Sequence, residues 1–222
     1  MGAGRRIKTG VIRFPGTNCD RDVFRALQAL GKNPVWLWHE DQFDAKEFDG
    51  VVLPGGFSYG DYLRSGALAA RAPVMKSVRE AAKMGRTVLG ICNGFQILCE
   101  ARLLDGVLTK NQSLRFMDQW VELEWKNSKG AIAGQAGQRL KIPIAHADGC
   151  YRTGDPSGET LKRLQESDQI VFTYVENPNG SEGSIAGLQN LQGNVVGMMP
   201  HPERAMAEWM GGVDGQAILG GF

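Results

Sequence analysis

The stretch RTVLGICNGFQILC, residues 86–99, joins an apolar strand pattern directly to a helical pattern, with no residues left for a loop. Cys92 lies at the junction between Gly90 and Gly94, which is the small-x-nucleophile-x-small spacing of a sharp strand-to-helix turn. Such a turn holds strained backbone that is tolerated only where its neighbours are small. The pattern therefore predicts a strand over 86–92, a helix after it, and a cysteine presented between them.

Apolar runs that predict strands alternate with helical patterns through the first half of the chain. The predicted strands are TGVIRF (9–14), PVWLWH (34–39), DGVVLPGG (49–56) and RTVLGIC (86–92), and the predicted helices span 20–30, 73–84 and 93–104. This order predicts an α/β fold with a mostly parallel central sheet and helices on both faces. Ligands bind beyond the carboxyl ends of such strands, so the loops 15–20, 54–62 and 92–96 should share one rim.

The second half of the chain predicts additional strands, several of them antiparallel. The alternating runs are WVELEW (120–125), RLKIPIAH (139–146), QIVFTYV (169–175) and NVVGMMPH (194–201). DPSGET and NPNGSEG are typical of surface turns. Because nothing between the halves resembles a linker and 222 residues suit one well-buried core, we expect residues 1–222 to form a single domain.

Composition limits the classes of function. With 25 basic and 24 acidic residues the net charge is +1, which predicts neither a nucleic-acid partner nor a membrane surface. The N-terminal residues are not followed by an apolar run long enough for a signal peptide, and no run reaches the roughly 18 apolar residues that cross a membrane, so we expect neither secretion nor membrane insertion. The four cysteines are scattered and form no CxxC pair, so the sequence predicts neither a disulfide framework nor a metal site. This use of cysteine is typical of proteins in the reducing cytoplasm. Phosphate-loop and dinucleotide-loop patterns are absent from the sequence, so no cofactor of those kinds is expected.

Cys92 has two interpretations. A cysteine at a helix N-terminus is stabilised as the thiolate, which makes it a nucleophile, whereas most free cysteines are small buried apolar residues. A nucleophile that attacks a carbonyl needs donors for the oxyanion. The backbone N–H of Asn93 and the amides near Gly55 and Gly56, in LPGGFSYGD (53–61), are the candidates.

A cysteine nucleophile also needs a base, and the chain has three histidines. His39 has the character of a surface residue at a strand end. His146 and His201 each have a carboxylate two residues later, Asp148 and Glu203, that could orient the imidazole. Spacing alone does not choose between them.

The motifs together resemble a known family. GICNGFQ and the C-terminal HPE resemble the triad-type (class I) glutamine amidotransferases, whose fold is flavodoxin-like. Within that class, several further segments are similar to the glutaminase subunits of phosphoribosylformylglycinamidine synthases, which serve purine biosynthesis: FPGTNCDRD (14–22), LPGGFSYGDYLRSGALA (53–69), NQSLRF (111–116), ENPNGS (176–181) and GNVVGMMPHPERA (193–205).

The resemblance implies a role for each matching residue. Cys92 would attack the side-chain amide of glutamine, His201 would carry the proton to the leaving ammonia, and Glu203 would orient His201. Gln96 would help to hold the substrate, while Gly55, Gly56 and Asn93 would surround the oxyanion. Relatives carry AHGEG where this chain has AHADG, so His146 and Asp148 are left outside the predicted site, and Cys19 is expected to be structural or to line it.

The resemblance also implies partners. Ammonia would pass to a separate synthetase subunit, which binds ATP and Mg²⁺ and converts formylglycinamide ribonucleotide into its amidine. A small third subunit would bridge the two. The chain itself would need glutamine and no cofactor.

Overall fold

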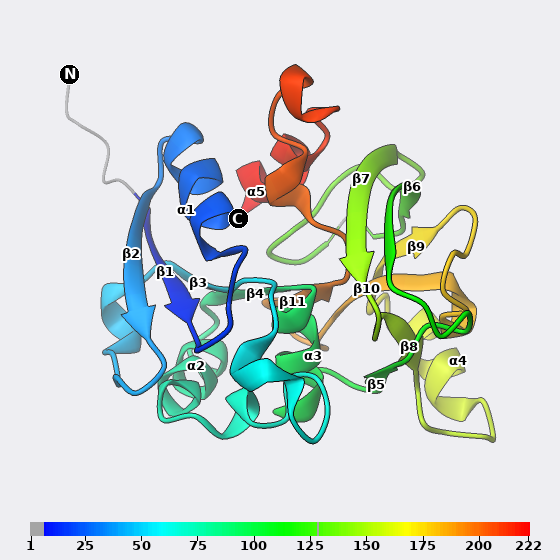
Figure 1. Ribbon diagram of the computed structural model, residues 1–222, viewed down its shortest axis with the longest axis horizontal. Helices are drawn as coiled ribbons and strands as arrows, with labels where there is room; N and C mark the ends of the chain where they lie inside the picture. Colours follow the sequence, from blue (N-terminus) through cyan, green and yellow to red (C-terminus); the bar gives the residue numbers. More distant parts are fainter. Residues whose placement is uncertain (1–6, 128) are drawn as a thin grey trace.

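The computed structural model describes residues 7–127 and 129–222, and its centre is one large mixed sheet (Figure 1). The strands follow the order β2-β1-β3-β4-β11-β10-β9-β6-β7 across this sheet. Their bounds are β1 (Lys8–Arg13), β2 (Asn33–Trp38), β3 (Gly50–Leu53), β4 (Thr87–Ile91), β6 (Met117–Trp125), β7 (Arg139–His146), β9 (Ile170–Tyr174), β10 (Ile185–Gln189) and β11 (Val195–Met198). A separate antiparallel pair is formed by β5 (Val107–Thr109) and β8 (Cys150–Arg152).

The first half of the sheet is parallel, as predicted. Strands β2, β1, β3, β4 and β11 run in one direction. β3 and β4 are covered on both sides, and this is why GVVL (50–53) and VLGI (88–91) are continuous buried runs rather than alternating ones. The carboxyl ends of these five strands therefore meet at one edge of the sheet.

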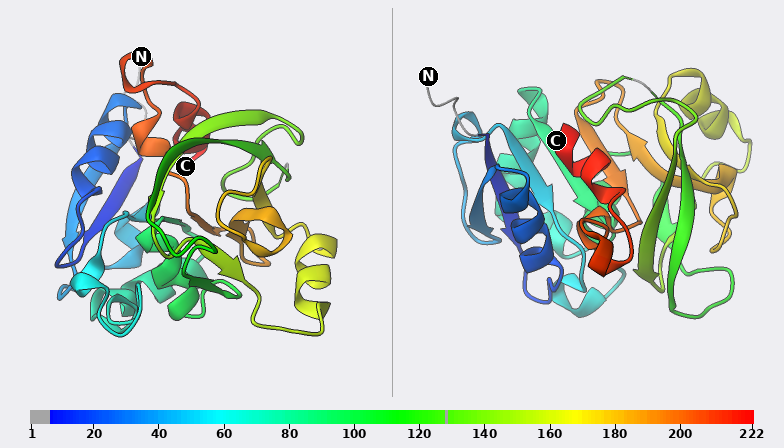
Figure 2. Two further views of the ribbon diagram at one scale, coloured as in Figure 1. Left: turned by 45° about the vertical axis from the view of Figure 1, so that its right-hand side comes forward. Right: turned by 90° about the horizontal axis from the view of Figure 1, so that it is seen from above.

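Helices cover both faces of the parallel half, which confirms the predicted α/β class. α1 and α5 lie on one side of the sheet, and α2 and α3 lie on the other (Figures 1 and 2). The helices are α1 (Asp20–Ala29), α2 (Val74–Lys83), α3 (Asn93–Glu100), α4 (Glu159–Glu166) and α5 (Gly215–Gly221). Short 3-10 turns are η1 (Ala45–Glu47), η2 (Ser58–Asp61), η3 (Ala69–Arg71), η4 (Glu182–Ser184), η5 (Pro202–Arg204) and η6 (Glu208–Met210). None of the helices within 7–127 and 129–222 is long and apolar enough to cross a membrane.

The second half extends the sheet with antiparallel strands, again as predicted. β10, β9, β6 and β7 each pair antiparallel with their neighbours. β6 and β7 form a long curved ribbon that rises beside the parallel half (Figure 2). Its end carries Pro143, Ala145 and His146 to the rim at which the parallel strands end.

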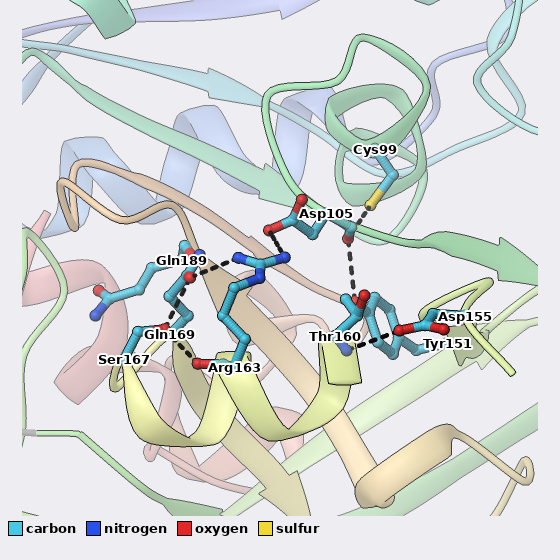
Figure 3. A network of polar contacts seen from close by, with 9 residues as sticks. All are labelled: Cys99, Asp105, Tyr151, Asp155, Thr160, Arg163, Ser167, Gln169 and Gln189. Atoms are coloured by element: carbon cyan, nitrogen blue, oxygen red, sulfur yellow. Dashed lines mark hydrogen bonds and ion pairs between the residues drawn. The ribbon is translucent and has the colours of Figure 1, made fainter. Parts of the chain in front are cut away.

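Helix α4 is attached to the remainder of the fold through a polar network that lies apart from that rim (Figure 3). The Arg163 guanidinium on α4 donates to the Asp105 carboxylate at 3.2 Å and to the Gln169 side chain at 3.4 Å. The Cys99 thiol lies 3.7 Å from the Asp105 carbonyl oxygen, and burial raises the pKa of this thiol well above its usual value. Cys99 is thus a packed, protonated thiol.

Candidate active site

Cys92 lies between β4 and α3 in a backbone conformation that residues other than glycine rarely adopt. Its φ of 52° and ψ of −107° are the strained geometry predicted for the turn. The Cys92 N–H donates to the Met198 carbonyl of β11 at 2.7 Å, which fixes the turn to the neighbouring strand. The residue is 5% exposed, and its thiol approaches the Ala145 carbonyl oxygen at 3.8 Å.

The two glycines of the motif are required by close backbone contacts. A Cβ at Gly94 would lie 1.9 Å from the Leu53 carbonyl oxygen of β3. A Cβ at Gly90 would lie 2.6 Å from the Gly94 backbone. Helix α3 can therefore begin directly against β3 and β4 only where both positions lack a side chain. This explains why the small residues flank the cysteine.

His201 reaches Cys92 because their strands are neighbours. β11 is parallel and adjacent to β4, so the segment after Met198 leaves the sheet beside the cysteine turn. The His201 N–H donates to the Pro143 carbonyl at 2.8 Å, which fixes the backbone to β7. Its Nδ1 lies 2.7 Å from Glu203 Oε1, and both residues are 1% exposed. The pairing fixes the ring with Nδ1–H donating to the carboxylate and Nε2 free for chemistry.

The charge state of His201 follows from its neighbours. Burial by itself lowers the pKa of the imidazole. The Glu203 carboxylate, the Cys92 thiolate and Cys19 together more than offset burial, so the pKa lies well above the usual histidine range. A protonated His201 beside the Cys92 sulfur is the acid partner that a cysteine nucleophile needs.

A small cavity of about 100 Å³ opens at this point, and Cys92 and His201 both line it. Its other lining residues are Asn18, Cys19, Gly56, Phe57, Phe116, Ala145 and Arg204. A larger groove of about 940 Å³ lies elsewhere, beside Arg64, Arg71 and Glu100. We place the chemistry in the smaller cavity because a nucleophile and a histidine with its carboxylate converge there.

The predicted oxyanion residues all lie at this rim. A Cβ at Gly55 would lie 2.8 Å from His201 Cε1 and 3.3 Å from Cys92 Cβ, so this glycine directly faces both. Gly56 has a φ of +141° and lines the cavity. Asn93 is the first residue of α3, where helix geometry leaves the N–H without an intrahelical partner. The Asn93 side chain holds the rim together by accepting from the Ser58 N–H at 3.2 Å.

Gln96 does not line the small cavity, and its side chain is engaged in the protein. Its Nε2 donates to the Asp148 carbonyl at 2.6 Å, and its Oε1 accepts from Asn93 Nδ2 at 2.8 Å. Ser65 in turn donates to the Asp148 carboxylate at 2.8 Å. Gln96 therefore ties the start of α3 to the 146–149 turn beside the site, and a direct contact with substrate remains a prediction.

The other two histidines are engaged differently from His201. His146 Nδ1 pairs with the Asn111 side chain at 3.0 Å and not with Asp148, and burial together with the nearby His201 lowers its pKa to about 4. His146 is therefore a neutral structural residue at physiological pH. His39 was expected at the surface, but it is buried and lies 2.6 Å from the Tyr59 hydroxyl.

Cys19 and Arg204 lie together in the site. Cys19 lines the cavity, which is one of the two positions expected for it, and its N–H donates to the Gly55 carbonyl at 3.2 Å. Arg204, which sequence reasoning missed, places its Nη2 3.2 Å from the Cys19 sulfur. Both residues fall within family-like segments of the sequence, FPGTNCDRD and MMPHPERA, but their contact is visible only in the fold.

Fold and site together define a glutamine amidotransferase. A family model described as a CobB/CobQ-like glutamine amidotransferase domain matches residues 6–216, and the chain belongs to this family. A chain in the structure of PurLQS from Thermotoga maritima is 41% identical, with a TM-score of 0.88 and 97% of each chain covered. These findings confirm the resemblance to the triad amidotransferases and to the glutaminase subunits of the purine-pathway synthase.

Two more distant structures share the fold. A putative GMP synthase component from Thermoplasma acidophilum is 16% identical, with a TM-score of 0.64 over 99% of this chain and 95% of that one. A glutamine amidotransferase from Thermotoga maritima is 20% identical, with a TM-score of 0.61 over 93% of this chain and 82% of that one. At these identities the likeness extends to the fold alone.

Proposed function

We propose that this chain is the glutaminase subunit of a phosphoribosylformylglycinamidine synthase, acting as one domain over residues 1–222. It hydrolyses glutamine and supplies ammonia to a synthetase subunit that makes formylglycinamidine ribonucleotide. The observation that carries the proposal is the convergence of Cys92 with the buried His201–Glu203 pair at the ends of two adjacent parallel strands. The relative in the PurLQS structure supports the choice of pathway.

The first half of the reaction is attack on the amide. The Cys92 thiolate adds to the side-chain carbonyl carbon of glutamine, and the carbonyl oxygen becomes an oxyanion. The N–H of Asn93 and the amides at Gly55 and Gly56 are placed to donate to this oxygen. His201 then gives its proton to the departing nitrogen, the carbon–nitrogen bond breaks, and ammonia leaves a glutamyl thioester on Cys92.

The second half regenerates the enzyme. Neutral His201 takes a proton from a water molecule as that water adds to the thioester carbonyl. The carbon–sulfur bond breaks, glutamate leaves, and the Cys92 thiolate and protonated His201 are restored. Glu203 keeps the imidazole in one orientation through both halves and stabilises its charge.

The ammonia acceptor lies on a partner in this proposal. ATP and Mg²⁺ bind on the synthetase subunit, a small third subunit bridges the two proteins, and the complex works in the cytoplasm. Ammonia must remain unprotonated to act as a nucleophile, so hydrolysis should be coupled to docking. This chain carries no cofactor of its own in the scheme.

We expect glutamate release from glutamine to be slow for the isolated chain and to rise with the synthetase partners, ATP and formylglycinamide ribonucleotide. The measurement follows glutamate and amidine product together in the reconstituted complex. Matched amounts of the two support the proposed pathway. Rapid glutamate release that no purine-pathway acceptor changes would contradict it.

We expect Glu203→Gln to lower kcat/KM for glutamine by about 10²–10⁴-fold. The carboxylate raises the pKa of His201, so its removal lowers that pKa. Because His201 must hold a proton to release ammonia, the basic limb of the pH–rate profile should shift to lower pH. Asp148→Asn removes a nearby carboxylate charge outside the proposed triad and should leave this limb in place. An unchanged limb in Glu203→Gln would exclude the proposed role.

A further inference from the structure

Cys19 is a second thiol in the catalytic cluster, and the proposed reaction gives it no task. One ligand atom from each of Cys19, His201 and Glu203 lies within 4.8 Å of the others, and all three residues are buried. Cys92 borders the same space, because a Cβ at Gly55 would lie 3.3 Å from both Cys19 Sγ and Cys92 Cβ. Cys19 Sγ, Cys92 Cβ and the His201 imidazole thus surround the position at which Gly55 lacks a side chain.

The imidazole is oriented as it is in many metal sites. His201 Nδ1 lies 2.7 Å from the Glu203 carboxylate, and a carboxylate in this position commonly fixes a metal-binding histidine. His201 Nε2 is buried and has no hydrogen-bond partner in the described part of the chain. Nε2 is therefore the ring nitrogen that is left free to bind a metal.

We propose that this cluster binds a thiophilic divalent cation, Zn²⁺ in the first instance, through Cys19 Sγ, Cys92 Sγ and His201 Nε2. A fourth position remains open to water. Two cysteines, one histidine and a water form a set of ligands that zinc accepts in tetrahedral geometry. The Cys92 thiol now lies near the Ala145 carbonyl, so it reaches the metal by rotating about its Cα–Cβ bond.

The local charges favour this state. Zn²⁺ binds thiolates and a neutral imidazole nitrogen, so both sulfurs bind as thiolates and the protonated His201 releases the proton on Nε2. Arg204 Nη2 lies 3.2 Å from Cys19 Sγ and places a positive charge beside this sulfur. With Glu203 ionised, the two thiolates and this carboxylate balance the charges of the metal and of Arg204. The bound cation therefore leaves no net charge buried in the cluster, which limits the cost of desolvation.

Metal binding and glutamine hydrolysis exclude one another. A Cys92 thiolate bound to Zn²⁺ has its sulfur lone pair engaged and cannot attack an amide, and His201 Nε2 cannot then carry a proton. The bound state is therefore an inhibited form of the enzyme, and glutamine and the cation compete for the same cluster.

The first test measures binding of Zn²⁺ to the metal-free full chain by competition with a chromogenic chelator. We expect one tight site in the wild type and an affinity lower by on the order of 100-fold or more in Cys19→Ala, because a direct ligand is lost. Cys99→Ala, which removes a buried thiol outside the cluster, should bind as the wild type does. No tight site in the wild type, or an unchanged affinity in Cys19→Ala, would overturn the proposal.

The second test needs no variant. Alkylation of each cysteine is followed by mass spectrometry with and without Zn²⁺. The metal should protect Cys19 and Cys92 together and leave the reactivities of Cys99 and Cys150 unchanged. Protection of Cys92 without Cys19 would show that Cys19 is not a ligand. Glutamate release should fall with Zn²⁺ in parallel with this protection and return when a chelator is added.

Discussion

Cys92→Ala is expected to lower glutamine-dependent product formation by about 10⁴-fold or more, because loss of the nucleophile removes the covalent route. The assembled complex should still form the amidine product when ammonium is supplied directly. The proposed acceptor chemistry lies on the partner, so it does not need the Cys92 thiol. Rates with glutamine and with ammonium, measured on the same preparation, separate the two steps.

The matched control is Cys99→Ala, which removes a buried thiol that contacts the Asp105 carbonyl outside the cavity. It should retain both activities. Loss of both activities in Cys92→Ala would mean that the substitution damages assembly. Retention of glutamine use would exclude Cys92 as the nucleophile.

The parallel half of the fold could be predicted because its signals are local. β3 and β4 are short apolar runs bounded by glycine, and the amphipathic helix α1 begins and ends within a residue of its predicted limits. The position of Cys92 could be predicted for the same reason, since Gly90 and Gly94 are its near neighbours in sequence.

The elements that could not be predicted lack local signals. Gly187 in β10 has no side chain, and a Cβ there would lie 3.0 Å from the Gly197 carbonyl oxygen. Close packing against the neighbouring strands therefore determines the position of β10, and an alternating pattern of apolar side chains does not. α4 is eight residues long and carries two leucines, Leu161 and Leu164, of which Leu164 alone is buried, so its apolar pattern is too short to stand out in the sequence.

Part of the candidate site could be predicted from the sequence, and part could not. His201 and Glu203 are two residues apart and form a pair that the sequence could suggest, although only the resemblance separated them from His146 and Asp148. The structure distinguishes the two histidines, because His201 pairs with Glu203 whereas His146 pairs with Asn111. The contact of Arg204 with Cys19 joins residues 185 positions apart, and only the order of β1, β3, β4 and β11 brings them together.

Gly94→Ala is expected to destabilise the fold by more than about 3 kcal/mol or to prevent folding. The new Cβ would meet the Leu53 carbonyl oxygen at 1.9 Å, and this atom belongs to the backbone of a central buried strand. Neither partner can move alone, because β3 is paired with β1 and β4 on its two sides. The midpoint of urea-induced unfolding measures the effect.

Gly220→Ala is the matched control, since a Cβ there meets nothing within 4 Å and this glycine has no positive φ. It should unfold at the wild-type urea concentration. If the Gly94→Ala protein is as stable as the wild type, α3 must lie further from β3 than it does in the structure. The start of α3 carries both Cys92 and the Asn93 N–H, so such a shift would also move the nucleophile away from His201. Any Gly94→Ala protein that does fold should therefore lose glutamine hydrolysis in greater proportion than it loses stability.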